Sequence, residues 1–162
     1  MGLRQRIFVL GKLGEAVGVF GLWVMLGTTL WDVIGAKVFK SPLSGATELV
    51  SFAQLLAVGA GMGMTLLLGR HIHVEYALHL LPHPLRGLLS ATGQLLIAAF
   101  FATIALYTWR FAQGLVLSGE VLPGLRVPVY PFVYAFWGLL VLNSLYGFYL
   151  FLEGLLKIRE RQ

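Results

Sequence analysis

The sequence predicts an all-α membrane protein: four transmembrane helices, with a short amphipathic interfacial helix between the second and the third. Hydrophobic residues make up 58% of the 162 residues, charged residues only 12%, and the mean hydropathy is +0.83. Soluble domains carry about 25% charged residues. The apolar residues gather into four segments that each approach or exceed the roughly 20 residues needed to cross a hydrocarbon core. We therefore expect residues 1–162 to form a single four-helix transmembrane domain.

The first predicted span covers residues 14–34 and follows the basic residues Arg4 and Arg6. It is too long for the apolar region of a secretory signal, so we treat it as part of the mature protein. Small residues recur along it at helical spacing, and such a stripe lets another helix approach closely. The stripe consists of Gly11, Gly14, Gly18 and Gly21.

The other three predicted spans carry similar small or polar stripes. The second span, residues 48–68, contains the Gly-x-x-x-Gly pair Gly59 and Gly63, a spacing typical of packed transmembrane helices. The third covers residues 88–107 and the fourth residues 131–156. Polar side chains within spans are predicted to form hydrogen bonds between helices. They are Gln54, Gln94 and Asn143.

The distribution of basic residues predicts the orientation of the chain. Eight of the twelve Lys and Arg residues lie near the two termini or in the loop 69–86, and four lie in the other two loops. Cytoplasmic loops carry the excess of positive charge, so both termini and the loop 69–86 are predicted to be cytoplasmic.

The composition also excludes several kinds of function. Without cysteine the chain has no disulfides, thiolate metal sites or thiol nucleophiles, and it has no basic surface of the kind that binds nucleic acid. Ion-coupled carriers need ionisable groups near the middle of the membrane. Here the acidic residues of the spans lie near the span ends: Glu15, Asp32, Glu48 and Glu153. The chain alone is poorly equipped to move an ion or a solute.

All four histidines fall within residues 69–86. Read as a helix, this segment places His71, Glu75 and His79 on one face and apolar residues on the other, and Pro82 ends it. We expect residues 72–81 to lie in the cytoplasmic interface, with Arg86 just beyond. A metal site and haem ligation are the alternatives. Both are disfavoured, because the segment has no known third ligand and because haem histidines should project from different spans.

A family resemblance rests on this segment and its surroundings. An acidic residue opens the second span (Glu48), a Gly-x-His-Ile-x-Val-acidic run follows it (residues 69–75), and a Leu-Pro pair precedes Arg86. In this order and spacing, residues 37–86 resemble the DctQ-type small membrane subunit of the tripartite ATP-independent periplasmic (TRAP) transporters.

The resemblance implies a non-catalytic scaffold without metal or cofactor, located in a bacterial inner membrane. In such systems a periplasmic binding protein delivers an organic acid to a large membrane subunit, which imports it with sodium. The small subunit packs on the large one, beside lipid. We predict that the residues of this contact are Glu48 and the glycines Gly11, Gly14, Gly18, Gly21, Gly59 and Gly63.

Two other functions stay open at this point. Small multidrug-type exporters also have four spans and use a carboxylate in the first, where this chain has Glu15. They have tighter loops than this chain. A membrane anchor subunit for haem or quinone is the second alternative.

Overall fold

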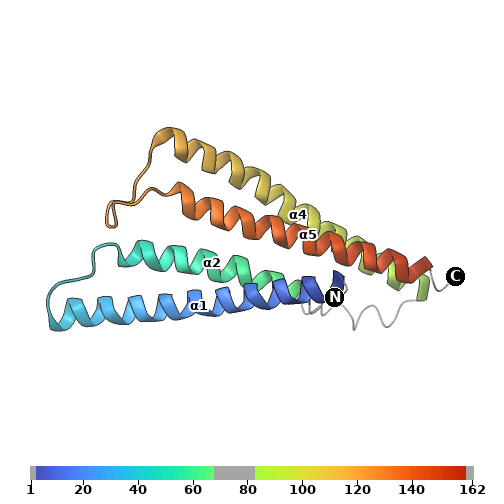
Figure 1. Cartoon of the computed structure of the whole chain (residues 1–162), viewed down its shortest axis with the longest axis horizontal. Coiled ribbons are helices and arrows are strands. Elements are labelled where there is room, and N and C mark those ends of the chain that lie inside the picture. The colour runs from blue at the N-terminus through green and yellow to red at the C-terminus, as the bar shows by residue number, and fades with distance from the viewer. Residues whose placement is uncertain (1–2, 68–82, 160–162) are drawn as a thin grey trace.

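The computed structural model describes residues 3–67 and 83–159, which form four long helices (Figure 1). Each helix contains a stretch long and apolar enough to cross a membrane. The predicted all-α fold with four spans is therefore confirmed. The helices are α1 (Leu3–Val38), α2 (Ala46–Leu67), α4 (His83–Ser118) and α5 (Tyr130–Arg159).

The helices exceed the predicted spans most clearly in α4, which runs to Ser118 instead of ending near residue 107. Its last turns stay helical because Ala112 and Leu115 are buried against Val133 of α5. Gly119, with φ of 62°, then ends the helix by donating its N–H to the carbonyl oxygen of Leu115. The loop to α5 is correspondingly shorter than predicted. With 36 residues, α1 and α4 are each about 54 Å long, and they exceed a hydrocarbon core of about 30 Å.

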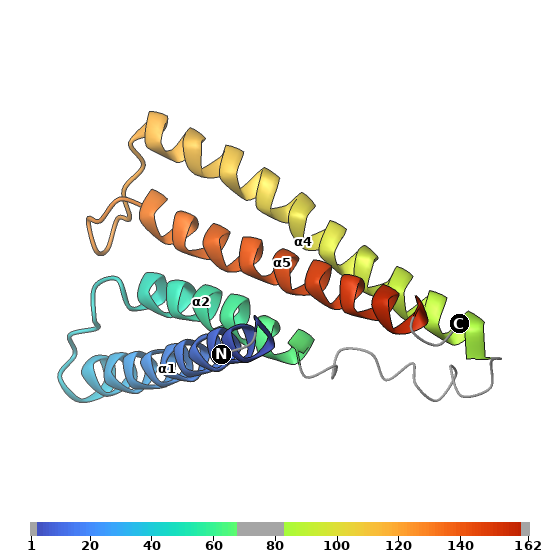
Figure 2. The same cartoon turned by 45° about the vertical axis from the view of Figure 1, so that its right-hand side comes forward.

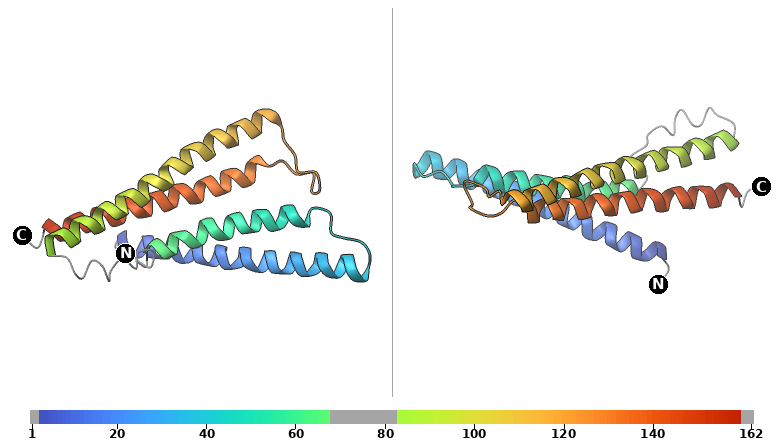
Figure 3. Two further views of the ribbon diagram at one scale, coloured as in Figure 1. Left: turned by 180° about the vertical axis from the view of Figure 1, so that it is seen from behind. Right: turned by 90° about the horizontal axis from the view of Figure 1, so that it is seen from above.

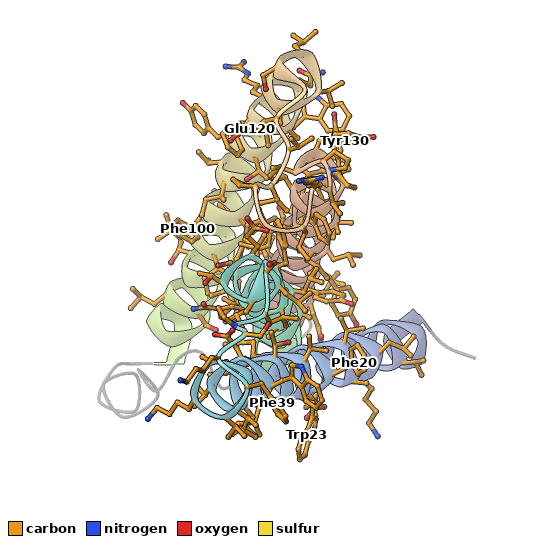
Figure 4. All side chains as sticks on the ribbon, turned by 90° about the vertical axis from the view of Figure 1, so that its left-hand side faces the viewer. Phe20, Trp23, Phe39, Phe100, Glu120 and Tyr130 are labelled. Atoms are coloured by element: carbon orange, nitrogen blue, oxygen red, sulfur yellow. The ribbon has the colours of Figure 1, made fainter. Side chains whose placement is uncertain are left out.

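The four helices form a row, not a closed bundle. In the described ranges, extensive contacts join α1 with α2, α2 with α5, and α5 with α4. Viewed along the helices, α1 and α4 lie at the two edges of the row, with α2 and α5 between them (Figure 4). A closed four-helix bundle would also pack α1 against α4, the two helices at the edges of this row. The row leaves the outer sides of α1 and α4 uncovered: Trp23 points away from the molecule and is 67% exposed.

The best-packed part of the row joins α2, α4 and α5. Leu66 of α2 is 1% exposed and packs with Phe101 and Ala105 of α4 and with Leu140 of α5. Towards the α4–α5 loop, aromatic side chains from both helices cluster, with ring centroids of Trp109 and Trp137 4.8 Å apart. These contacts fix the α4–α5 hairpin and attach α2 to it.

The molecule has two distinct ends. The α1–α2 loop, residues 39–45, and the α4–α5 loop, residues 119–129, lie together at one end, hereafter the loop end (Figure 2). The N-terminus of α1 and the C-terminus of α5 lie towards the other end (Figure 1). Seen from above, the N-terminal part of α1 diverges from α4 and α5 (Figure 3). The two loops therefore lie on the same side of the row of spans.

Candidate functional site

Glu48 connects the two loops at the loop end. It lies in the first turn of α2, and its two carboxylate oxygens accept hydrogen bonds from consecutive backbone N–H groups of the α4–α5 loop. Gly124 donates to Oε1 and Leu125 donates to Oε2, each at 2.9 Å. Hydrogen bonds to a charged acceptor are stronger than neutral ones. Negative charge is also stabilised at a helix N-terminus. We call this arrangement the Glu48 clasp.

Two glycines make the clasp sterically feasible. A side chain at Gly124 would place its Cβ 2.6 Å from the Cα of Gly45, so the two loop backbones are in close contact. Gly45 has φ of 85°, a conformation that favours glycine, and its open side is filled by Leu125. The loops therefore pack as one unit.

A second carboxylate fixes the α1–α2 loop. Asp32 Oδ1 accepts the backbone N–H of Leu43 at 2.8 Å. Asp32 and Glu48 thus both hold loop backbone in place. Sequence reasoning missed these partners, because a backbone N–H donor leaves no side-chain signal in the sequence.

The glycine stripe of α1 packs on α2 of the same chain. A Cβ at Gly14 or Gly18 would lie 3.3 Å from a carbonyl oxygen of α2, that of Ala60 or Ala57 respectively. At Gly21 the distance to the carbonyl oxygen of Ala53 would be only 2.9 Å. Gly11 is buried on the same stripe. The stripe therefore mediates packing between two helices of the same chain. Its contact with a partner subunit stays a prediction.

Gly59 and Gly63 contact α5 on another side of α2. A Cβ at Gly59 would lie 3.1 Å from Phe136 and Leu139, and one at Gly63 would lie 2.9 Å from Oδ1 of Asn143. Asn143 is 1% exposed and donates from Nδ2 to the carbonyl oxygen of Gly59 at 2.8 Å. The predicted interhelical hydrogen bond of Asn143 is confirmed.

The other two polar residues predicted for this role behave differently. Gln54 is exposed on α2. Gln94 is half-buried, and its Oε1 has no hydrogen-bond partner among the described residues. One interhelical hydrogen bond was not predicted from the sequence. The hydroxyl group of Ser144 donates to the carbonyl oxygen of Ala98 at 3.0 Å and joins α5 to α4.

An apolar pocket of about 200 Å³ lies between α1, α2 and α5. Val17 of α1, Gly59 and Gly63 of α2, and Leu139 and Asn143 of α5 contribute to its lining. No charged side chain lines it. Such a pocket suits hydrocarbon or a neighbouring helix and offers no counter-charge to a carboxylate or a cation.

The described residues contain no group of three or more His, Asp or Glu side chains that could hold a metal ion. Glu15 is exposed on α1, near the terminal end of its apolar stretch. The predicted interfacial residues His71, Glu75 and His79 lie outside the described residues, and Arg86 lies in the first turn of α4. The interfacial helix therefore stays a prediction.

Comparison with known sequence families finds a match to the DctQ component of the tripartite ATP-independent periplasmic transporters, over residues 25–156. No curated protein and no solved structure gives a significant match. The matched segment spans the loop end, α2, α4 and most of α5, and covers most of the chain. The chain therefore belongs to the DctQ family and is a small, multi-pass membrane component of a TRAP transporter.

Proposed function

We propose that this chain is a non-catalytic scaffold that packs on the large membrane subunit during sodium-coupled uptake of organic acids. A periplasmic binding protein supplies the substrate, and the complex lies in a bacterial inner membrane. Both termini are cytoplasmic, which places the loop end on the periplasmic side. The single domain supplies lateral surface for the complex, and the large subunit supplies the substrate path.

The row of helices is the observation that carries this proposal. A path for an ion or a carboxylate needs a polar interior enclosed by helices. In the described ranges, the extensive contacts of α1, α2, α5 and α4 are those between neighbours in the row. A single layer has two broad faces and two edges, so it can extend a membrane wall without enclosing a path.

The placement of polar groups supports the same interpretation. Charged groups in a membrane interior are costly and are kept for function. In the described part of the chain, Asp32 and Glu48 lie near the loop end and Glu153 lies near the end of α5. The central parts of the spans are joined by close glycine contacts and by the uncharged side chains of Asn143 and Ser144.

The test is reconstitution of the large membrane subunit into proteoliposomes, with and without this chain. The liposomes receive purified binding protein, a radiolabelled carboxylate and an inward sodium gradient. We expect both membrane subunits to be needed for uptake and this chain alone to give none. Equal uptake by the large subunit without this chain would contradict the scaffold role, and so would uptake by this chain alone.

A further inference from the structure

One side-chain amide is exposed near the middle of a span. Gln54 is the ninth of the 18 residues in the apolar stretch Ala46–Gly63 of α2, about 12 Å along the helix from Ala46. Its side chain is exposed, and its amide group forms no hydrogen bond within the described residues. Lipid tails offer neither donor nor acceptor, so an unpaired amide in hydrocarbon is costly. The amide of Gln54 therefore needs a partner outside this chain.

Other polar groups of the spans do not have this need. Asn143 and Ser144 bond to neighbouring helices, as described above. Gln113 is an exposed amide near the loop end of α4, where a long side chain can reach the polar region of the membrane. Gln54 differs from them, because it has neither an internal partner nor a place near a span end. Several exposed hydroxyl groups donate to carbonyl oxygens of their own helices: those of Thr29, Ser51 and Thr103.

Gln54 belongs to a side of α2 that points away from both neighbouring helices. Exposed residues recur there every three or four positions, a spacing that places them on one side of a helix. We call this side the α2 outer face. Gly61 lies beside it, and a Cβ at Gly61 would meet nothing within 4 Å. Bare backbone of this kind lets another helix approach closely. The residues of the α2 outer face are Thr47, Ser51, Gln54, Val58 and Met62.

The apolar pocket lies on the opposite side of α2. Gly63 follows Gln54 by nine residues, or about two and a half helical turns, so the two residues lie on opposite sides of the helix. Gly63 lines the pocket together with Leu142 of α5, which is 41% exposed. One broad face of the row thus carries an unpaired amide, and the other carries a pocket suited to hydrocarbon.

The row offers two broad faces and two edges for packing on the large subunit. We propose that the α2 outer face packs on a membrane-spanning helix of that subunit, and that Gln54 forms a hydrogen bond with a hydroxyl or amide side chain of this helix. This inference rests on the proposed function. A polar side chain on a packed helix satisfies the amide, which lipid does not. The pocket face is then left to lipid.

The first test identifies what covers each face in the assembled complex. A photoreactive benzophenone amino acid replaces either Val58 on the α2 outer face or Leu142 beside the pocket, and membranes that contain both subunits are illuminated. We expect position 58 to crosslink to the large subunit and position 142 to give adducts with lipid only. Position 58 without such a crosslink would overturn the proposal, whether it labels lipid, a second copy of this chain or nothing. A crosslink from position 142 to the large subunit would also overturn it.

The second test measures the hydrogen bond of Gln54. Gln54→Met removes the amide and keeps the length of the side chain. Association of the two fluorescently labelled subunits is followed by energy transfer in liposomes as lipid dilutes them. We expect association to weaken about three- to tenfold, as for one interhelical hydrogen bond in a membrane. Gln54→Asn, which retains a shorter amide, should lie between Gln54→Met and the wild type. Gln113→Met is the matched control and should associate like the wild type.

Thermal stability of this chain without the large subunit separates a lost partner from a lost fold. Because the Gln54 amide has no hydrogen bond within the described residues, Gln54→Met should be at least as stable as the wild type. A loss of stability in the isolated chain would give Gln54 an internal role and overturn the proposal. Unchanged association in Gln54→Met, or an equal loss in Gln113→Met, would do the same.

The wild-type measurement distinguishes this inference from the proposed function. If the two wild-type subunits do not associate, the proposed function fails, and the contact of the α2 outer face fails with it. If the wild-type subunits associate but Gln54→Met does not weaken them, the contact through Gln54 alone is rejected.

Discussion

Glu48 and Gly124 lie 76 positions apart in the sequence and are joined by a 2.9 Å hydrogen bond between a carboxylate oxygen and a backbone N–H. The second oxygen of the same carboxylate binds the next N–H, that of Leu125. One side chain at the start of α2 therefore determines where the α4–α5 loop lies.

Removal of the Glu48 carboxylate should release this loop. We expect Glu48→Ala to lower the free energy of unfolding by about 1–3 kcal/mol, because two charge-assisted hydrogen bonds are lost. Glu48→Gln should lie between Ala and the wild type, since it retains one carbonyl acceptor. Thermal unfolding of the purified protein measures the order of stability. Thr47→Ala is a matched control, because Thr47 is the exposed neighbour in the same helical turn. Equal stability of Glu48→Ala and the wild type would contradict the clasp.

Asn143 should contribute to stability through its bond to α2. We expect Asn143→Ala to destabilise the protein by about 1–2 kcal/mol, which combines a lost interhelical hydrogen bond with a small cavity. Ser144→Ala is the comparison, because Ser144 bonds to α4 instead. Cysteine pairs placed across α2 and α5 can report the contact by crosslinking, since the chain has no natural cysteine. Crosslinking across α2 and α5 should fall in Asn143→Ala and stay unchanged in Ser144→Ala. The reverse order would show that Asn143 does not hold α2 against α5.

Two glycines of α1 offer a matched pair for testing helix packing. A Cβ at Gly21 would lie 2.9 Å from the carbonyl oxygen of Ala53, whereas one at Gly27 would meet nothing within 4 Å. We expect Gly21→Leu to cost at least about 1–3 kcal/mol, since the two backbones must separate. Gly27→Leu should be neutral or stabilising, because leucine has the better helix propensity. Thermal unfolding and the yield of folded protein measure the effect of each of the two substitutions on stability. Similar losses in the two variants would mean that α1 does not pack on α2 through this stripe.

The sequence predicted the spans well because hydropathy depends on local composition. It misjudged the end of α4, where polar residues such as Arg110 and Gln113 interrupt the apolar run at residues 108–118. Both side chains are exposed, and burial of Ala112 and Leu115 against α5 keeps the segment helical. This packing depends on residues about twenty positions further along the chain, and a local pattern does not reveal it.

The candidate site was predictable only in part. The glycine stripes were identified as packing surfaces, but spacing does not say which helix a stripe meets, and these stripes meet helices of the same chain. Glu48 was identified as important through a resemblance, while its partners are backbone N–H groups with no sequence signature. Lys40 and Arg126 in the two loops have positive φ, 52° and 54°. The sequence does not predict this conformation, because neither residue type favours it.

Glu15 is the carboxylate that an autonomous exporter would use. Glu15 is exposed on α1 and lies four residues into the apolar stretch that begins at Gly11, towards the terminal end. A coupling carboxylate should lie near the middle of a span and face a polar path. We therefore expect Glu15→Gln to leave the sodium dependence and the substrate affinity of the reconstituted transporter unchanged within about twofold. The same variant should show no difference from the wild type in export of a cationic dye from cells. Asp32→Asn serves as a comparison, because it weakens the acceptor for the Leu43 N–H and should lower stability without altering sodium affinity. A shift of sodium affinity in Glu15→Gln with assembly intact would place this chain on the transport path, and a specific loss of dye export would support the exporter instead.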